Sequence, residues 1–98
     1  MPDVTIVYWR DIPAQVIVGK GRRAAKRVLD ARFEQAIDRA AMKIGAKDAD
    51  AYLSEWRKVA AGAQDGDGEA IAKAKADALE QEYDAARLKA LIDADGWA

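Results

Sequence analysis

Apolar residues near the start of the chain follow a strand-like pattern. In residues 4–9 both sets of alternating positions are largely apolar, so neither face of this segment can be left fully to water. Residues 15–18 are short and rich in β-branched side chains, which favours a second strand. Pro13 fits the turn between them or the first position of the second strand. We therefore expect a β-hairpin over residues 3–19.

An isolated hairpin is only marginally stable in water. We therefore expect helices to cover one face of this hairpin, while its other face or an outer edge stays available for pairing with a partner.

From about Arg22 the apolar residues recur at intervals of three and four, which predicts an amphipathic helix. This stripe continues to Ile44, and the following glycine is typical of a helix end. The pattern predicts a first helix over residues 22–44. A second helix is expected over residues 48–60, with Asp48 as its N-cap.

The polar, glycine-rich segment 62–68 predicts a loop before a third helix over residues 69–94. The apolar face of this last helix shifts near Asp84, which leaves open a kink or a separate fourth helix. Ninety-eight residues form one small domain, 1–98. We expect an α+β fold in which an N-terminal β-hairpin packs against three helices, or four if the last one breaks.

The composition argues against several kinds of chemistry. The chain has no histidine and no cysteine, so the commonest general base, the commonest metal ligand and thiol nucleophiles are all missing. We expect no catalytic residues, no cofactor and no metal site, and hence not an enzyme. Apolar runs are too short to span a membrane, and the N-terminus lacks the pattern of a signal peptide, so a cytoplasmic location is expected.

Charge is distributed unevenly, although the formal net charge is only −1. Residues 1–47 hold ten Lys and Arg against five Asp and Glu, whereas residues 48–98 hold six against twelve. Such asymmetry indicates either an anion-binding half or two halves that attract each other within the fold.

The strongest candidate for binding is a group of four cations, which we call the basic cluster: Arg22, Arg23, Lys26 and Arg27. On a helix they would occupy adjacent strips of one face. Two interpretations stay open: a solvated face that complements the acidic half, or a surface that steers an acidic partner protein. In the second interpretation Trp9 and Arg10 would anchor the contact, because aromatic and arginine side chains often dominate interface energetics.

An alternative site is the predicted helix start itself. Backbone amides near Gly19 and Gly21, together with Lys20, Arg22 and Arg23, would favour a small anion there. A phosphorylated or polyglutamylated ligand would suit such a site. Nucleic acid is disfavoured as a partner, because the sequence pI near 5.4 opposes phosphate binding.

Four strings in the sequence resemble the small "virulence factor" domain family of proteobacteria. They are Val-Tyr-Trp-Arg-Asp-Ile-Pro-Ala-Gln-Val (7–16), Ala-Lys-Arg (25–27), Arg-Phe-Glu-Gln-Ala-Ile-Asp-Arg-Ala-Ala-Met (32–42) and Asp-Ala-Tyr-Leu-Ser-Glu-Trp (50–56). The family has no established biochemical activity and no catalytic residues to transfer. Members of this family tend to be genomic neighbours of one-carbon enzymes, including methylenetetrahydrofolate reductase and corrinoid-dependent methyl transfer proteins. The resemblance therefore implies an accessory role in methyl-group metabolism.

Together these observations favour a non-catalytic accessory or adaptor domain. Its expected partner is a larger cytosolic protein, with a folate or corrinoid enzyme as the candidate that the resemblance implies. Neither a membrane nor nucleic acid is expected as a partner, and homodimers through the hairpin edge remain open. The alternative is a module that binds a small anionic ligand at residues 19–23.

Overall fold

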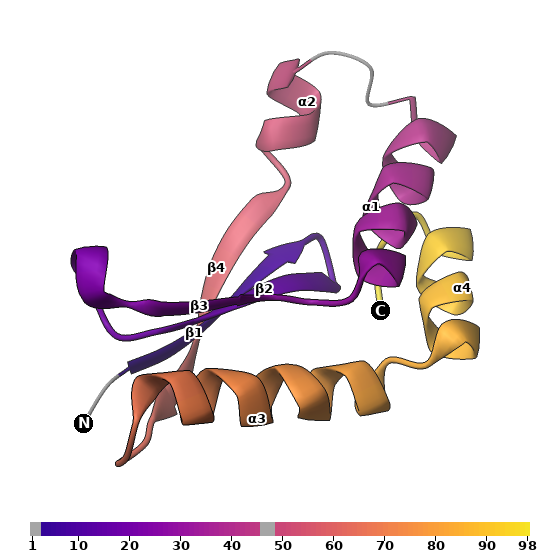
Figure 1. Cartoon of the computed structure of the whole chain (residues 1–98). Coiled ribbons are helices and arrows are strands. Elements are labelled where there is room, and N and C mark those ends of the chain that lie inside the picture. The colour runs from indigo at the N-terminus through magenta and orange to yellow at the C-terminus, as the bar shows by residue number, and fades with distance from the viewer. Residues whose placement is uncertain (1–2, 46–48) are drawn as a thin grey trace.

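The structure is a computed structural model that describes residues 3–45 and 49–98. In this part of the chain a four-stranded antiparallel sheet packs against α-helices, which confirms the predicted α+β class (Figure 1). The strands, in the spatial order β3-β2-β1-β4, are β1 (Asp3–Trp9), β2 (Ile12–Val18), β3 (Ala25–Val28) and β4 (Trp56–Ala63). The helices are α1 (Ala31–Lys43), α2 (Ala49–Leu53), α3 (Gly68–Glu82) and α4 (Ala85–Asp93).

The predicted first helix begins later than the sequence pattern indicated. Residues 25–28 form β3, which pairs with β2, and only Gly21–Arg23 before it forms a short 3₁₀ turn. The α-helix starts at Ala31, where the Asp30 side chain accepts a hydrogen bond from the Arg32 amide at 3.4 Å. Four residues are too few for periodicity to separate a strand from a helical turn, so pairing with β2 decided the conformation.

The predicted second helix is shorter than expected, and residues 56–60 of its range belong to a strand. α2 ends at Leu53, and β4 then pairs along β1, with Trp56 opposite Trp9. Alanine and glycine in β4 are poor strand formers, so this strand owes its conformation to the ladder with β1 rather than to propensity. The expected cap, Asp48, lies outside the described residues.

The hairpin of β1 and β2 matches the predicted range, but its edges are not free. β3 pairs with the outer side of β2, and β4 pairs with the outer side of β1. The expectation that the hairpin itself offers an edge is therefore wrong. The edges of the sheet belong to β3 and β4.

The predicted third helix breaks in two, as its shifting apolar face allowed. α3 ends at Glu82, and α4 starts after Asp84, whose side chain accepts a hydrogen bond from the Arg87 amide at 2.8 Å. α3 covers one face of the sheet, while α1 and α4 pack together beyond the end where β1 turns into β2 (Figure 1). The buried residues between these layers include Val4, Ile6, Val16, Val18, Phe33, Ile37, Ile71 and Leu79.

The opposite face of the sheet, which we call the open face, is covered at the end of β1, where the register adds the buried Trp9 opposite Trp56, and its residues away from that end are half-buried or exposed. Strand partners in register share a face, because side chains alternate along each strand. The register therefore puts one set of side chains together: Thr5, Val7, Gln15, Ile17, Lys26, Val28, Lys58 and Ala60. Several of these residues are apolar, and each of them is half-buried or exposed.

Candidate interaction surface

The basic cluster lies at one end of the sheet and along its edge. Arg22 and Arg23 project from the 3₁₀ turn, and Lys26 and Arg27 belong to the edge strand β3. All four side chains are exposed. Since Lys26 and Arg27 are consecutive in a strand, they point to opposite faces of the sheet rather than along one helical face. The cluster is thus spread around the β3 edge.

The basic cluster makes no ion pair with any residue that the structure describes. The pairs that link the basic and acidic halves use other side chains: Arg10–Glu55 at 3.2 Å, Lys43–Asp95 at 2.9 Å and Arg57–Asp11 at 2.6 Å. Lys20 pairs at 3.6 Å with Asp3, which belongs to the basic half. The interpretation in which the cluster complements the acidic half therefore gains no support from the described contacts.

Trp9 and Arg10 do not lie where an interface anchor would be needed. Trp9 is 0% exposed, and its indole Nε1 donates a hydrogen bond to the Tyr52 carbonyl at 3.0 Å. The Arg10 side chain is 15% exposed and pairs with Glu55. Because β1 is covered on both faces near its end, the residue that we expected at the surface became part of the core. Neither residue therefore belongs to the candidate interface.

Arg10 instead holds the turn between β1 and β2. Its guanidinium lies 5.2 Å from the Trp9 ring and 5.0 Å from the Trp97 ring, and it donates to the Asp95 carbonyl at 2.6 Å. The neighbouring Asp11 amide donates to the Gly96 carbonyl at 2.8 Å. These contacts attach the turn to the segment after α4, so the role of Arg10 here is structural.

The alternative anion site at Gly19, Lys20, Gly21, Arg22 and Arg23 loses its physical basis. No α-helix begins there, because the 3₁₀ turn has only three residues and β3 follows it. The positive end of a helix dipole, which would attract an anion, is therefore missing. None of these five residues lines the apolar cavity beside β3 or the groove between α1 and α4.

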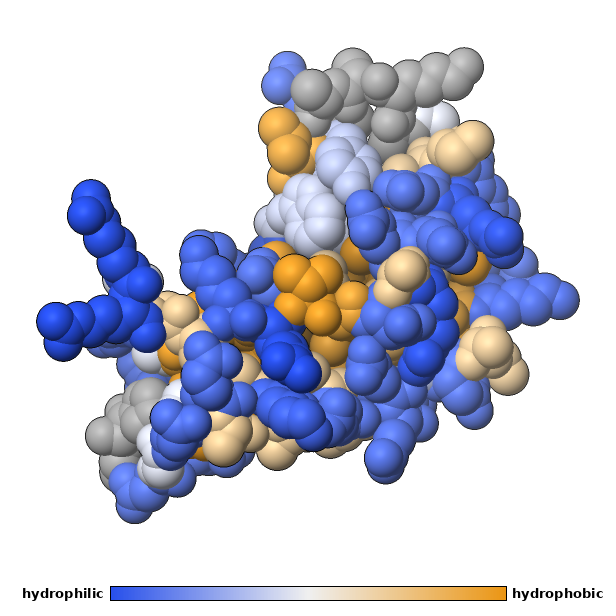
Figure 2. Space-filling model, viewed as in Figure 1, coloured by the Kyte–Doolittle hydropathy of each residue, from blue (hydrophilic) through white to orange (hydrophobic). Residues whose placement is uncertain are grey.

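An apolar cavity opens on the open face beside β3. Its volume is about 250 Å³, and its lining comes from all four strands, α1 and α2: Val7, Ala14, Gln15, Val28, Leu29, Glu34, Ile37, Tyr52 and Trp56. The rings of Tyr52 and Trp56 meet edge to face with centroids 5.9 Å apart. Val28, at the end of β3, is 71% exposed. Figure 2 shows an apolar patch on this side of the molecule with hydrophilic side chains around it.

This cavity could not be found from the sequence pattern. Tyr52 and Trp56 were expected on the buried side of one helix, whereas the structure puts them on α2 and β4. Burial raises the pKa of Tyr52 above its usual value, with the carboxylates of Asp38 and Glu34 adding to the effect. The Tyr52 hydroxyl therefore stays protonated at neutral pH.

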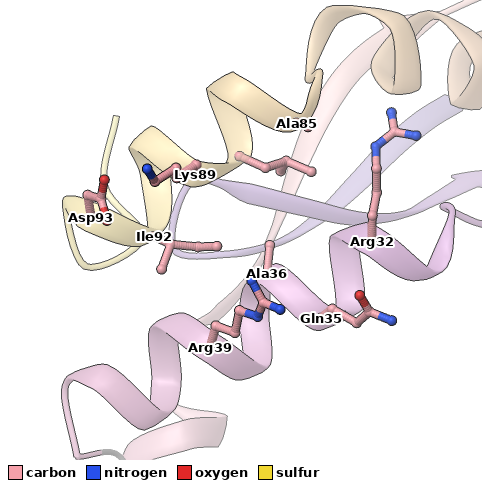
Figure 3. Close-up of a pocket in the computed structure, with 9 residues that line it drawn as sticks. Arg32, Gln35, Ala36, Arg39, Ala85, Lys89, Ile92 and Asp93 are labelled. Atoms are coloured by element: carbon pink, nitrogen blue, oxygen red, sulfur yellow. The ribbon is translucent and has the colours of Figure 1, made fainter.

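A second groove, of about 360 Å³, runs between α1 and α4. Its floor is apolar, and its rim carries Arg32, Arg39, Lys89 and Asp93. Figure 3 shows Arg39 on α1 and Lys89 on α4, with Ala36 and Ile92 between them. Arg32 is already engaged, since it donates to the carbonyls of Glu80 and Tyr83. Arg39 and Lys89 form no ion pair with any described residue.

The residues that the structure describes hold no group of three or more acidic side chains placed to bind a metal ion. Among the same residues, no helix has both the length and the apolar character needed to cross a membrane.

Comparison with known proteins identifies the family of the chain. No curated protein and no solved structure matches the sequence. The sequence model of the family described as "Virulence factor" matches residues 7–92, which is most of the chain and includes all four strings that carried the resemblance. The chain therefore belongs to the virulence factor family.

Proposed function

We propose that this domain is a non-catalytic accessory domain that binds an acidic surface of a larger protein. The observation that carries the proposal is the basic cluster on the β3 edge. Its four exposed cations form no ion pair with a described acid, and an apolar cavity begins at Val28, at the end of the same strand.

The basic cluster and the apolar cavity would contribute to binding in different ways. Exposed cations accelerate and orient the encounter with an acidic surface but add little affinity by themselves. Buried apolar and aromatic contacts supply most of the affinity. Val28, Tyr52 and Trp56 border the cavity, so they take the anchoring role that Trp9 and Arg10 were expected to have.

The identity of the partner is part of the same proposal. The family resemblance implied a genomic association with one-carbon enzymes, so we propose a cytosolic folate or corrinoid enzyme as the larger protein. This part of the proposal is independent of the surface, since any acidic protein would suit the charges.

Charge reversal tests the surface directly. The variant Lys26→Glu/Arg27→Glu should lose a stoichiometric partner that the wild-type domain retains from its host at low salt. The matched control is Arg39→Glu/Lys89→Glu, which makes the same change in net charge at exposed cations on α1 and α4. Equal loss in both variants would contradict a specific role for the β3 edge.

The α1–α4 groove supports a second candidate function, the binding of a small anionic ligand. Arg39 on α1 and Lys89 on α4 lie on opposite sides of an apolar floor, and neither forms an ion pair with a described acid. Pyrophosphate and tetraglutamate serve as probes in thermal unfolding at constant ionic strength. A rise in Tm that Arg39→Glu/Lys89→Glu abolishes would support this function, and no rise with either probe would contradict it.

A further inference from the structure

We infer that the partner segment is an extended, acidic peptide that pairs with β3 as a fifth strand and places one apolar side chain over the cavity. This inference rests on the proposed function and specifies the partner's chemistry. Three observations carry it: the backbone of β3, the charge around it and the position of the cavity.

The backbone groups of β3 that face away from the sheet can be identified from the hydrogen bonds. The Leu29 amide donates to the Ala14 carbonyl at 3.0 Å, so Leu29 faces β2. Backbone groups alternate along a strand, so the amides and carbonyls of Lys26 and Val28 face outward. β3 has no neighbour on that side in the sheet order. An added strand would satisfy these groups.

The charge around this edge selects the class of partner. Two copies of β3 paired with each other would bring Lys26 and Arg27 close to their own counterparts, and like charges on adjacent strands are destabilising. Lysine on an edge strand therefore disfavours self-association. An acidic strand instead turns the same cations into cross-strand pairs, and Arg22 and Arg23 extend the positive surface beyond the strand.

The register gives an order for the partner's residues. An antiparallel addition matches the rest of the sheet and is the more stable arrangement. The partner's residue opposite Val28 then comes first and lies on the open face, where the cavity begins. The residues opposite Arg27 and Lys26 follow it. The expected motif, from N- to C-terminus, is therefore apolar–acidic–acidic.

Selection from a library of displayed random ten-residue peptides tests this inference on the whole chain. The expected result is enrichment of an aromatic or branched apolar residue followed by two acidic residues. Addition of a selected synthetic peptide should then slow the hydrogen exchange of the Lys26 and Val28 amides. Peptides that bind without protecting these two amides, or a selection without acidic enrichment, would overturn it.

Two variants at one position separate backbone pairing from side-chain contact. Proline is tolerated in an edge strand where its missing N–H faces solvent. Val28→Pro should therefore keep the fold and weaken the selected peptide about three- to tenfold, by loss of one backbone hydrogen bond. Val28→Thr keeps the amide and similar volume, and it should weaken the peptide less than Val28→Pro does.

The outcomes distinguish this inference from the proposed function. If Lys26→Glu/Arg27→Glu loses the natural partner while no library peptide binds, the surface is functional but its occupant is a folded acidic face, and the strand inference is wrong. If peptides bind at β3 and the natural partner is unaffected by charge reversal, the proposed function fails.

Discussion

Gly96 is a residue at which the packing of the β1–β2 turn can be tested. Its φ is 92°, and an added Cβ would lie 3.1 Å from both the Trp9 ring and the Arg10 side chain. Gly96→Ala should therefore lower the free energy of unfolding by about 2–4 kcal/mol, from backbone strain and overpacking together. Chemical denaturation measures this change.

Gly62 supplies a matched control for that substitution. It has the same φ of 92°, but an added Cβ would meet no atom within 4 Å. Gly62→Ala should cost about 1–2 kcal/mol, which is the backbone strain alone. Equal costs at the two glycines would contradict a tightly packed turn.

Two partly buried tyrosines, Tyr8 and Tyr83, should make the stability of the fold depend on pH in the alkaline range. Burial raises the pKa of Tyr8 and Tyr83 above the usual value of 10.0, and each is further affected by nearby charged groups. In the unfolded chain the phenols ionise near that value, while in the folded protein they still hold their protons. The contribution of the protonated phenols to the free energy of unfolding is therefore complete below about pH 10. It is lost as the pH rises through the pKa that these phenols have in the folded protein.

Thermal unfolding between pH 8 and pH 11 provides the measurement, since these limits bracket the ordinary phenol pKa of about 10. Tyr8→Phe/Tyr83→Phe should show a smaller fall in Tm across this range than the wild type. Lysine titration affects both proteins alike. Parallel curves for the two proteins would mean that the phenols do not contribute.

At the scale of the elements, the junction between α3 and α4 depends on one cap. Asp84 accepts the Arg87 amide at 2.8 Å, and Arg87 also pairs with Glu82 at 3.2 Å. Asp84→Ala should lower the free energy of unfolding by about 1 kcal/mol, which is typical of an N-cap. Asp84→Asn keeps a side-chain acceptor and should cost less. If Asp84→Asn lowers the free energy of unfolding at least as much as Asp84→Ala does, the capping hydrogen bond does not stabilise this junction.

Local signals in the sequence predicted some elements well and others poorly. The hairpin was predicted, and a break near Asp84 was left open as an alternative, because alternation, turn residues and the shift in apolar face are local. β3 and β4 were missed because each is short or alanine-rich and takes its conformation from a neighbour distant in sequence. Trp9 was misplaced for the same reason: it is buried through contact with Tyr52, which is distant in sequence.

The candidate site was predicted in part. Arg22, Arg23, Lys26 and Arg27 were singled out as the binding surface, and the structure leaves all four exposed. The cavity beside them was not predicted, because Val28, Tyr52 and Trp56 come together only through the sheet order and the packing of α2. Charged residues can be identified from a sequence, whereas the apolar cavity beside them is formed only by the tertiary structure.

At the scale of the whole molecule, the ion pairs separate structural cations from available ones. Arg10, Lys43 and Arg57 join the basic and acidic halves, whereas the basic cluster contacts no described acid. Arg22→Glu/Arg23→Glu/Lys26→Glu/Arg27→Glu should therefore change the free energy of unfolding by less than about 1 kcal/mol. A larger loss in urea denaturation would indicate that the cluster supports the fold.

We propose that β3 and its cations form the surface that binds a partner. The most direct measurement is binding of the partner retained from the host to the wild type, Lys26→Glu/Arg27→Glu and Arg39→Glu/Lys89→Glu at low and high salt. We expect that the wild type and the α1–α4 variant bind with similar affinity, that added salt weakens both, and that the β3 variant binds at least about tenfold more weakly. Equal affinity of the β3 variant and the wild type would contradict it.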